Sequence, residues 1–321
     1  MHFQVKRVSK IFCNGLHNGF PGFCKFGDSY YIAFRTGDNH MSYNGRITLI
    51  RSQNLQAWEI AAEIKLDLVD LRDPRLIVFD GQLLMYCGVR QHDIDPQSVL
   101  FISKDGSNFH QENIDGLEGY WLWCIKKHDG ILYGSGYRMS DGEYHVKLYT
   151  SSNGIIWQKQ LDLPAGSETS LDFSGDGTLY ALIRDDCHGS CPKIAIIDSP
   201  YTAIRSWETL PVRLQGPMIK RMNNGCVIIG RRWDSPGRFN VRTDVLWLED
   251  EHEIKFIRTL PSGGDCSYAA WIDIDDHSAV IAYYSAHEHK IDGINENNII
   301  NDPAAAEHST PADIYLAEVY H

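Results

Sequence analysis

The sequence predicts an all-β protein: a six-bladed β-propeller formed by residues 1–321 as a single domain. Three observations favour this fold class. The chain lacks the long three-to-four-residue periodicity that is typical of amphipathic helices. A serine-led motif recurs along it at a nearly constant interval. Six short runs of turn-forming residues, each between two strand-like segments, recur with a similar period.

The repeated motif has Ser at its start, Asn or Asp two residues later, and an aromatic residue six residues after the serine. It reads SQNLQAW at 52–58, SKDGSNF at 103–109 and SSNGIIW at 151–157, with a looser copy, SPYTAIRSW, at 199–207. Successive copies start 51, 48 and 48 residues apart. A unit of this length accommodates four strands, as in one propeller blade.

Each unit is expected to contain an inner hairpin with a tight turn, because Gly, Asn and Asp tolerate the positive φ that such turns require. The turns are FGDS at 26–29, DG at 80–81, DG at 129–130, GDG at 175–177, NNG at 223–225 and DDH at 275–277. Two strand-like ends of the chain, FQVKRV at 3–8 and DIYLAEVY at 313–320, are each able to complete the last blade. The polar stretch 289–310 is predicted to be a loop insertion in that blade.

The composition disfavours several classes of partner and cofactor. A formal net charge of −12 argues against nucleic acid or an anionic membrane as partner. No apolar run reaches the roughly 20 residues of a membrane-spanning helix. The N-terminal residues lack the apolar region of a secretory signal, so a cytoplasmic location is expected unless a signal has been removed. Cys187 and Cys191 are close together, but no second pair of zinc ligands accompanies them, and neither a metal nor another cofactor is predicted.

Residues at the open ends of the hairpins can be placed by counting outward from each turn, because directly opposed residues share one face of a sheet. Around Asp176, Glu168 falls opposite Arg184; alone, such a pair is typical of a surface ion pair. The same count sets Trp121 opposite Arg138, Arg231 and Arg232 opposite Gly216 and Pro217, and Tyr268 opposite Tyr284, and it places Arg35, Arg72 and Asp73 at the same end. These ends converge at one end of a propeller axis, so a single polar pocket is expected there.

The chain resembles the bacterial members of the sialidase superfamily of six-bladed propellers. The Ser-x-Asp/Asn-Gly-x-x-Trp pattern is similar to the Asp-box, or BNR repeat, of that superfamily, a turn motif of the outer rim to which we assign no catalytic part. The motifs HNGFPGF, FRTGDNH, LRDPRL, YWLW, SETSLDF, QGPMI, SGGDCSY and AYYSAHE look like its successive blade motifs. The resemblance implies an exo-acting glycoside hydrolase for a terminal acidic sugar, sialic acid or a related ulosonic or uronic acid, on an oligosaccharide or glycoconjugate.

The resemblance also implies a retaining mechanism. Retaining sialidases use a tyrosine nucleophile, a glutamate as its base, an aspartate as acid/base and three arginines that hold the substrate carboxylate. Glu168 and Arg184 match the glutamate and second-arginine hairpin, and Tyr268 in GDCSYAAW looks like the nucleophile. A phenol with a pKa of about 10 attacks poorly until a carboxylate takes its proton, which fits a tyrosine paired with a glutamate.

Two parts of this pattern stay open in the sequence. The tripeptide HNG at 17–19 stands where the first arginine is expected, and Arg35 follows one strand later. The acid/base has three candidates. Asp38 and His40 lie in RTGDNH, and Asp73 lies in LRDP, which resembles the inner aspartate of other propeller glycosidases.

Further side chains are candidates for binding the sugar. They are Arg35, Arg72, Arg184, Arg231, Trp121, Tyr284 and His287. For the arginines the alternative is an ion pair between blades, and for Trp121 it is core packing. Two other functions stay open: a non-catalytic carbohydrate-binding propeller, and a glycosidase that uses a carboxylate pair on a neutral sugar. The second is typical of five-bladed propellers, against which the six turns argue.

Overall fold

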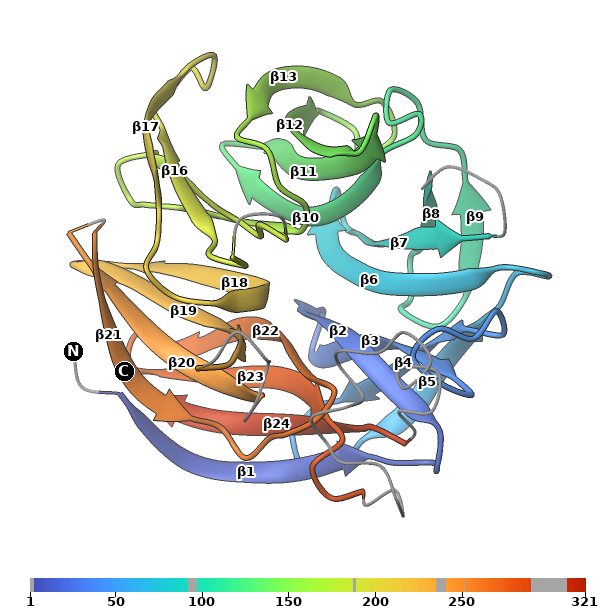
Figure 1. The fold of residues 1–321 in the computed structure, drawn as a ribbon. Helices are drawn as coiled ribbons and strands as arrows, with labels where there is room; N and C mark the ends of the chain where they lie inside the picture. The colour runs from blue at the N-terminus through green and yellow to red at the C-terminus, as the bar shows by residue number, and fades with distance from the viewer. Residues whose placement is uncertain (1–2, 92–96, 187–188, 235–240, 251, 290–310) are drawn as a thin grey trace.

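The computed structural model describes residues 3–91, 97–186, 189–234, 241–250, 252–289 and 311–321. Six antiparallel sheets of four strands each form a ring around a central axis (Figure 1). The predicted six-bladed β-propeller is therefore confirmed. Throughout these ranges the chain forms strands and turns and no helix, and hence no helix long and apolar enough to cross a membrane.

In the first five blades the strands follow chain order from the axis outward, because the first strand of each blade contacts the first strands of its neighbours. Blade 1 contains β2 (His17–Phe26), β3 (Ser29–Gly37), β4 (Arg46–Ser52) and β5 (Glu59–Ile64). Blade 2 contains β6 (Asp70–Phe79), β7 (Gln82–Arg90), β8 (Gln97–Ser103) and β9 (Phe109–Glu112). Blade 3 contains β10 (Trp121–His128), β11 (Ile131–Ser140), β12 (Glu143–Ser151) and β13 (Gln158–Leu163).

The remaining blades continue the same order until both chain ends meet in the last one. Blade 4 contains β14 (Thr169–Phe173), β15 (Leu179–Ile183), β16 (Lys193–Ile197) and β17 (Ile204–Thr209). Blade 5 contains β18 (Leu214–Met222), β19 (Gly225–Arg232), β20 (Arg242–Glu249) and β21 (Glu253–Thr259). Blade 6 contains β22 (Cys266–Asp275), β23 (Ser278–Ser285), β24 (Asp313–Tyr320) and, outermost, β1 (Gln4–Phe12).

Blade 6 closes the ring because β1 pairs antiparallel with β24, so both predicted terminal strands contribute to it (Figure 1). The predicted loop insertion at 289–310 falls between β23 and β24. Of that stretch, residues 290–310 lie outside the described residues.

The core lies between neighbouring sheets. The central strands β15 and β16 are buried along their whole length, as their sequences LYALI and KIAII lead one to expect. The outer strands β17 and β21 consist of half-buried and exposed residues because one face meets solvent. Packing of this kind on both faces holds the inner hairpins rigidly, and the residues at their open ends are fixed with them.

The serine-led motifs form the turns between the third and fourth strands of blades 1 to 3, and the looser copy begins the corresponding turn of blade 4. In blade 2, Oδ1 of Asp105 accepts backbone N–H bonds of 2.8 Å from both Ser107 and Asn108. The motif thus provides hydrogen-bond acceptors for the backbone N–H groups of an outer turn.

Candidate active site

A cavity of about 490 Å³ opens at the end of the ring where the inner strands begin, and all six blades contribute to its lining. Its charged lining residues are Arg72, Arg90, Arg184 and Arg231 together with Asp73, Glu168, Asp186 and Asp265. Arginines and carboxylates are equal in number, so protein carboxylates balance the positive charge of the cavity. The predicted convergence of hairpin ends on one pocket holds for Arg72, Asp73, Glu168, Arg184, Arg231 and Tyr268.

β-Bulges direct several of these side chains into the cavity. Five inner strands, β2, β6, β10, β18 and β22, contain a bulge near their first residues, and β14 does not. In three of them a cavity-lining residue has a left-handed backbone: Phe20 (φ 60°), Asp73 (φ 46°) and Tyr268 (φ 53°). Such a conformation costs about 1–3 kcal/mol in a residue other than glycine and is found where a bulge re-aims a side chain beside a functional site.

Glu168 and Arg184 lie opposite each other at the open end of the β14–β15 hairpin, as the sequence predicts. The backbone N–H of Arg184 donates a 3.0 Å hydrogen bond to the backbone carbonyl of Glu168. Nη1 of Arg184 lies 2.8 Å from Oε2 of Glu168, and Nε donates a 2.8 Å hydrogen bond to Asp186. These two carboxylates outweigh burial and raise the pKa of Arg184 well above its ordinary value. The pair is part of the cavity wall, and a surface ion pair is excluded.

Tyr268 joins this pair from blade 6. Its hydroxyl donates a 2.6 Å hydrogen bond to Oε1 of Glu168 and accepts a 3.1 Å bond from Nη1 of Arg184. Burial, with the nearby charge of Glu168, raises the pKa of Tyr268 well above its ordinary value. The phenol is therefore protonated, and Glu168 is positioned to take its proton when the oxygen attacks an electrophile.

Arg231 and Asp265 form a second buried pair beside the Tyr268 ring. Nη2 of Arg231 donates 2.8 Å and 2.7 Å hydrogen bonds to Asp265 and to the Tyr284 hydroxyl, and its guanidinium carbon lies 5.4 Å from the centre of the Tyr268 ring. Across the hairpin, Arg231 pairs with Gln215 and Arg232 with Leu214. The predicted pairing of these arginines with Gly216 and Pro217 is wrong because the β18 bulge shifts the register.

Arg72 and Asp73 enter the cavity from β6. Nη1 of Arg72 donates hydrogen bonds of 2.9 Å to Asp70 and 2.6 Å to the carbonyl of His40. Asp73 is only 5% exposed, and its Oδ1 has no hydrogen-bond partner within the described residues. Burial raises the pKa of Asp73 to about 6, against the lowering effect of Arg75 and Arg72. A carboxyl group with this pKa can donate a proton in weakly acidic solution.

Arg35 does not line the cavity, contrary to the expectation that it binds substrate. Its side chain is fully buried and donates hydrogen bonds to Oδ1 of Asp70 (2.5 Å) and to the carbonyls of Asn39 (2.8 Å) and Ser42 (2.9 Å). Arg35 therefore holds the β3–β4 loop, which carries His40, against blade 2.

The two acid/base candidates of this loop differ in position. Asp38 is exposed and does not contribute to the cavity lining. His40 lines the cavity, and its Nδ1 forms a short hydrogen bond with Oδ2 of Asp265. Burial lowers the pKa of His40 to about 4, although Asp265 favours the protonated ring. Among the three candidates, His40 and Asp73 thus face the cavity.

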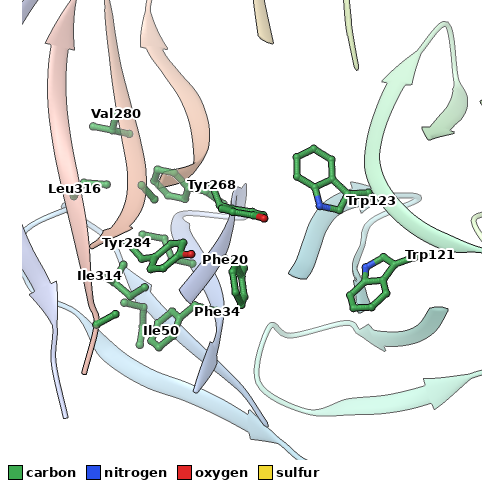
Figure 2. Close-up of a cluster of buried hydrophobic side chains, with 14 residues drawn as sticks. Phe20, Phe34, Ile50, Trp121, Trp123, Tyr268, Val280, Tyr284, Ile314 and Leu316 are labelled. Atoms are coloured by element: carbon green, nitrogen blue, oxygen red, sulfur yellow. The ribbon is translucent and has the colours of Figure 1, made fainter. Parts of the chain in front are cut away.

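The remaining predicted binding residues are placed as follows. Trp121 lines the cavity and also belongs to the buried cluster that contains Tyr268; it lies with Trp123 opposite Tyr268 and Phe20 (Figure 2). It pairs with Tyr137, and the predicted pairing with Arg138 is wrong because of the β10 bulge.

Tyr284 is fully buried behind the cavity wall, so it supports Arg231 and Asp265 and does not contact a ligand directly. It pairs with Ser267, and the predicted pairing with Tyr268 is wrong because of the β22 bulge.

His287 also lies outside the described cavity lining. Its Nδ1 forms a 2.9 Å hydrogen bond with the Ser285 hydroxyl, and its ring packs on Tyr315.

Asp265, Asp186 and Gln215 line the cavity but were not predicted from the sequence. Asp265 immediately precedes β22, three residues before Tyr268, and accepts bonds from four side chains. Asp186 accepts bonds from Arg184 and, at 3.0 Å, from Gln215. The available signal was the position of both aspartates just outside an inner hairpin, at the same end as Glu168.

His17, His40 and Asp265 are the group of three among the described residues whose donor atoms lie close enough, within 4.8 Å, to hold a metal ion. Oδ2 of Asp265 already accepts from both histidines, with Nε2 of His17 at 2.7 Å. Nδ1 of His17 is buried with no hydrogen-bond partner in the described part of the chain. A metal-bound imidazole usually donates through its other nitrogen, so His17 lacks the support that such ligands have. The contacts fit a hydrogen-bonded carboxylate better than a metal site.

Solved structures share this fold. A protein of unknown function from Dyadobacter fermentans matches with a TM-score of 0.81 and 14% identity, over 99% of this chain and 99% of its own. The sialidase of Trypanosoma rangeli, solved with the inhibitor DANA, matches with a TM-score of 0.65 and 12% identity, over 95% of this chain and 55% of its own. A GH32 β-fructofuranosidase from Bombyx mori matches with a TM-score of 0.57 and 14% identity, over 95% of this chain and 60% of its own.

At these identities the likeness shows the propeller fold alone. By sequence, the chain matches no protein-family model and no curated protein. The structural neighbours include glycoside hydrolases of several propeller families.

Proposed function

We propose that the protein is an exo-acting, retaining glycoside hydrolase for a terminal acidic sugar, sialic acid or a related ulosonic or uronic acid. The observation that carries the proposal is the 2.6 Å hydrogen bond from the Tyr268 hydroxyl to Glu168 in a cavity lined by arginines. A protein that only binds sugar has no need of a phenol paired with a base. The fold shared with a sialidase and other propeller glycosidases supports the hydrolase class.

In the first half-reaction, the oxygen of Tyr268 attacks the anomeric carbon, Glu168 takes the phenolic proton, and the bond to the leaving oxygen breaks as an acid of the cavity, His40 or Asp73, protonates that oxygen. Because the pKa of Tyr268 is raised, the phenol stays neutral until it reacts, and a neutral nucleophile does not repel an anionic substrate. In the second, water displaces Tyr268 from the anomeric carbon, the deprotonated acid takes a proton from that water, and Glu168 returns the phenolic proton to Tyr268. Two inversions give net retention of configuration.

Arg72, Arg184 and Arg231 are proposed to bind the substrate carboxylate, without Arg35. They line the cavity from blades 2, 4 and 5. Each is oriented by a protein carboxylate, Arg72 by Asp70, Arg184 by Glu168 and Arg231 by Asp265. A guanidinium group carries five N–H donors, and these pairings occupy only some of them, so each arginine retains donors for a ligand.

A second candidate is a glycosidase that uses Asp73 and Glu168 as a carboxylate pair on a neutral sugar. The observation in its favour is the pKa of Asp73 of about 6, to which the charge of Glu168 contributes. A pair of interacting carboxyl groups, one of which has a raised pKa, is typical of acid and base partners in glycosidases. In that mechanism the Tyr268 hydroxyl is dispensable.

Aryl glycosides of sialic, other ulosonic, uronic and neutral sugars, with NMR of the first-formed product, test the proposal. We expect turnover of an acidic glycoside with retained configuration. Tyr268→Phe and Glu168→Gln should each lower kcat by about 10²-fold or more, since each removes one reacting group and keeps the shape. Circular dichroism of both variants should match the wild type.

Three results separate the alternatives. Full activity of Tyr268→Phe would transfer the assignment to the Asp73–Glu168 pair. Turnover of neutral glycosides only would reject the acidic substrate. Sugar binding by wild type and variants alike, without turnover by any of them, would show a non-catalytic propeller.

A further inference from the structure

We propose that His40, held by Asp265, is the group that protonates the leaving oxygen and then deprotonates the attacking water. This inference rests on the proposed retaining hydrolase and adds to it the acid/base that the sequence left open between Asp38, His40 and Asp73.

The geometry of His40 leaves one ring nitrogen available to a ligand. Nδ1 is bonded to Oδ2 of Asp265, and because the carboxylate can only accept, Nδ1 carries the proton. No hydrogen bond joins Nε2 to any residue in the described ranges. The side chain is 21% exposed and lines the cavity. A base oriented by a third group, with its free nitrogen toward the substrate, is the arrangement that general acid–base catalysis requires.

Asp265 is itself fixed, which makes the orientation of His40 rigid. Oδ1 accepts hydrogen bonds of 2.8 Å from Arg231 and 2.6 Å from Tyr284, and Oδ2 accepts a 2.7 Å bond from His17. The backbone of His40 is fixed as well, because its carbonyl accepts a 2.6 Å bond from Arg72. A catalytic group must be held within about 0.5 Å of its productive position, and these contacts supply that restraint.

His40 and Tyr268 both border the same ring, that of Phe20. The ring centres lie 5.2 Å apart for His40 and Phe20 and 4.9 Å apart for Tyr268 and Phe20. A sugar placed over Phe20 can therefore meet the nucleophile and the acid/base together. Asp73, by contrast, is not oriented in this way, because its Oδ1 has no hydrogen-bond partner within the described residues.

The proton balance closes over the two half-reactions. Protonated His40 gives its Nε2 proton to the glycosidic oxygen as the bond from that oxygen to the anomeric carbon breaks and Tyr268 bonds to the carbon. Water then takes the place of the alcohol and gives a proton to Nε2 as its oxygen bonds to the carbon and the bond to Tyr268 breaks. The enzyme returns to its starting protonation state, and the net reaction is hydrolysis.

Asp265 stabilises the protonated ring, which is present before the first half-reaction and again after the second. Burial opposes ionisation of Asp265, but His40, His17 and Arg231 hold its pKa well below the ordinary range. The groups that face His40 are Asp265, which favours protonation, and Arg72 and His17, which oppose it. Since burial lowers the pKa of His40 to about 4, its acid form becomes more abundant as the pH falls. Hydrolysis of glycosides with basic leaving groups is therefore expected to be faster in acidic solution.

A metal ion on the same three side chains is the competing interpretation. Donor atoms at about 2.0–2.1 Å from a tetrahedral ion lie roughly 3.3 Å apart, farther than the 2.7 Å between His17 and Asp265. A metal ion bound to these side chains would also place a second positive charge beside Arg231, which already bonds to Asp265. The contacts therefore favour proton transfer.

The test uses a series of aryl glycosides whose phenols differ in acidity, with His40→Gln and, as matched control, Asp73→Asn. His40→Gln should lower turnover of the least acidic phenol by about 10²–10⁴-fold and that of the most acidic phenol far less. Azide should restore the turnover of the glycoside with the most acidic phenol by His40→Gln, and the product should be a glycosyl azide of retained configuration. The rise in wild-type kcat/KM toward acidic pH should disappear in this variant. Asp73→Asn should show neither azide rescue nor a leaving-group effect.

The proposal is overturned if Asp73→Asn shows the leaving-group effect and azide rescue and His40→Gln does not. It is also overturned if the wild type binds one equivalent of Zn²⁺ in equilibrium dialysis and His17→Gln does not. Failure of the proposed function gives a different result: Tyr268→Phe keeps wild-type turnover, or no aryl glycoside is cleaved by the wild type.

Discussion

Tyr268 and Glu168, 100 residues apart in the chain, share a 2.6 Å hydrogen bond on the wall of the central cavity. The bond joins blade 6 to blade 4, and Arg184 lies 3.1 Å from the phenol oxygen and 2.8 Å from the carboxylate. Phenol, base and cation thus meet at one point, which the proposed mechanism assigns to attack on an anomeric carbon.

Arg184→Met tests whether the substrate is acidic. The variant lacks the guanidinium that is proposed to contact the substrate carboxylate and that pairs with Glu168. We expect kcat/KM for the acidic glycoside to fall by about 10²-fold or more, because a charge-assisted contact is lost. Steady-state kinetics on the acidic glycoside and on its carboxamide analogue measures the effect. An equal loss on both would show that Arg184 does not recognise the carboxylate.

Arg35→Met tests the structural role of the buried arginine. Removing the guanidinium leaves Asp70 short of a partner, and breaking a buried ion pair from one side costs about 3–5 kcal/mol. Urea denaturation should show this loss, and His40 should lose its support because Arg35 holds its loop. Arg51→Met, which breaks the exposed pair with Glu59, is the control and should hardly change the midpoint. Equal midpoints for the two variants would contradict the role given to Arg35.

Asp73→Asn tests the pKa of about 6 of this carboxyl group. Because the folded state binds this proton more tightly than the unfolded chain does, the contribution of Asp73 to stability is complete below its ordinary pKa of 3.8 and is lost as the pH rises through 6. A shift of about 2 pKa units corresponds to roughly 3 kcal/mol. Between pH values of about 4 and 7, the unfolding free energy of the variant should therefore gain about that much relative to the wild type.

Urea denaturation of both proteins across this range measures the difference. The titrations of His17 and His40 are common to both proteins, so they cancel to first order. A wild-type-to-variant difference that stays constant with pH would refute the raised pKa.

Gly88→Ala tests how Trp121 is positioned. A Cβ atom at residue 88 would lie 1.8 Å from Cε2 of Trp121, so the indole would have to leave its place against Tyr137. We expect a loss of about 1–3 kcal/mol in stability from overpacking, and a higher KM because Trp121 lines the cavity. Gly175→Ala, where an added Cβ meets nothing within 4 Å, is the control. An unchanged KM in Gly88→Ala would remove Trp121 from the binding residues.

The blade number, the ring closure and the Glu168–Arg184 pair were predictable because each depends on local rules. Turn residues repeat at a fixed period, and β14–β15 is a regular hairpin with no bulge, so counting outward from the turn finds the true partners. The same counting failed for Trp121, Arg231 and Tyr268, because a bulge near the start of β10, β18 and β22 shifts the register. A bulge leaves no clear mark in a single sequence.

The roles of Arg35 and Asp265 were not predictable for another reason. Both depend on contacts between blades: Arg35 bonds to Asp70 of blade 2, and Asp265 bonds to side chains of blades 1 and 5 as well as its own. A charged residue at an open hairpin end looks the same in the sequence whether it faces the cavity or a neighbouring blade. Only the packing of one sheet on the next separates the two cases.

Trapping of the covalent intermediate tests whether Tyr268 is the nucleophile. A fluorinated acidic sugar with an activated leaving group should slow the second half-reaction and leave the sugar on the enzyme, and peptide mass spectrometry then locates it. We predict one equivalent of sugar on the peptide that contains Tyr268, and none in Tyr268→Phe. An adduct on Glu168 or Asp73, or complete turnover of natural substrate by Tyr268→Phe, would contradict the assignment of Tyr268 as the nucleophile.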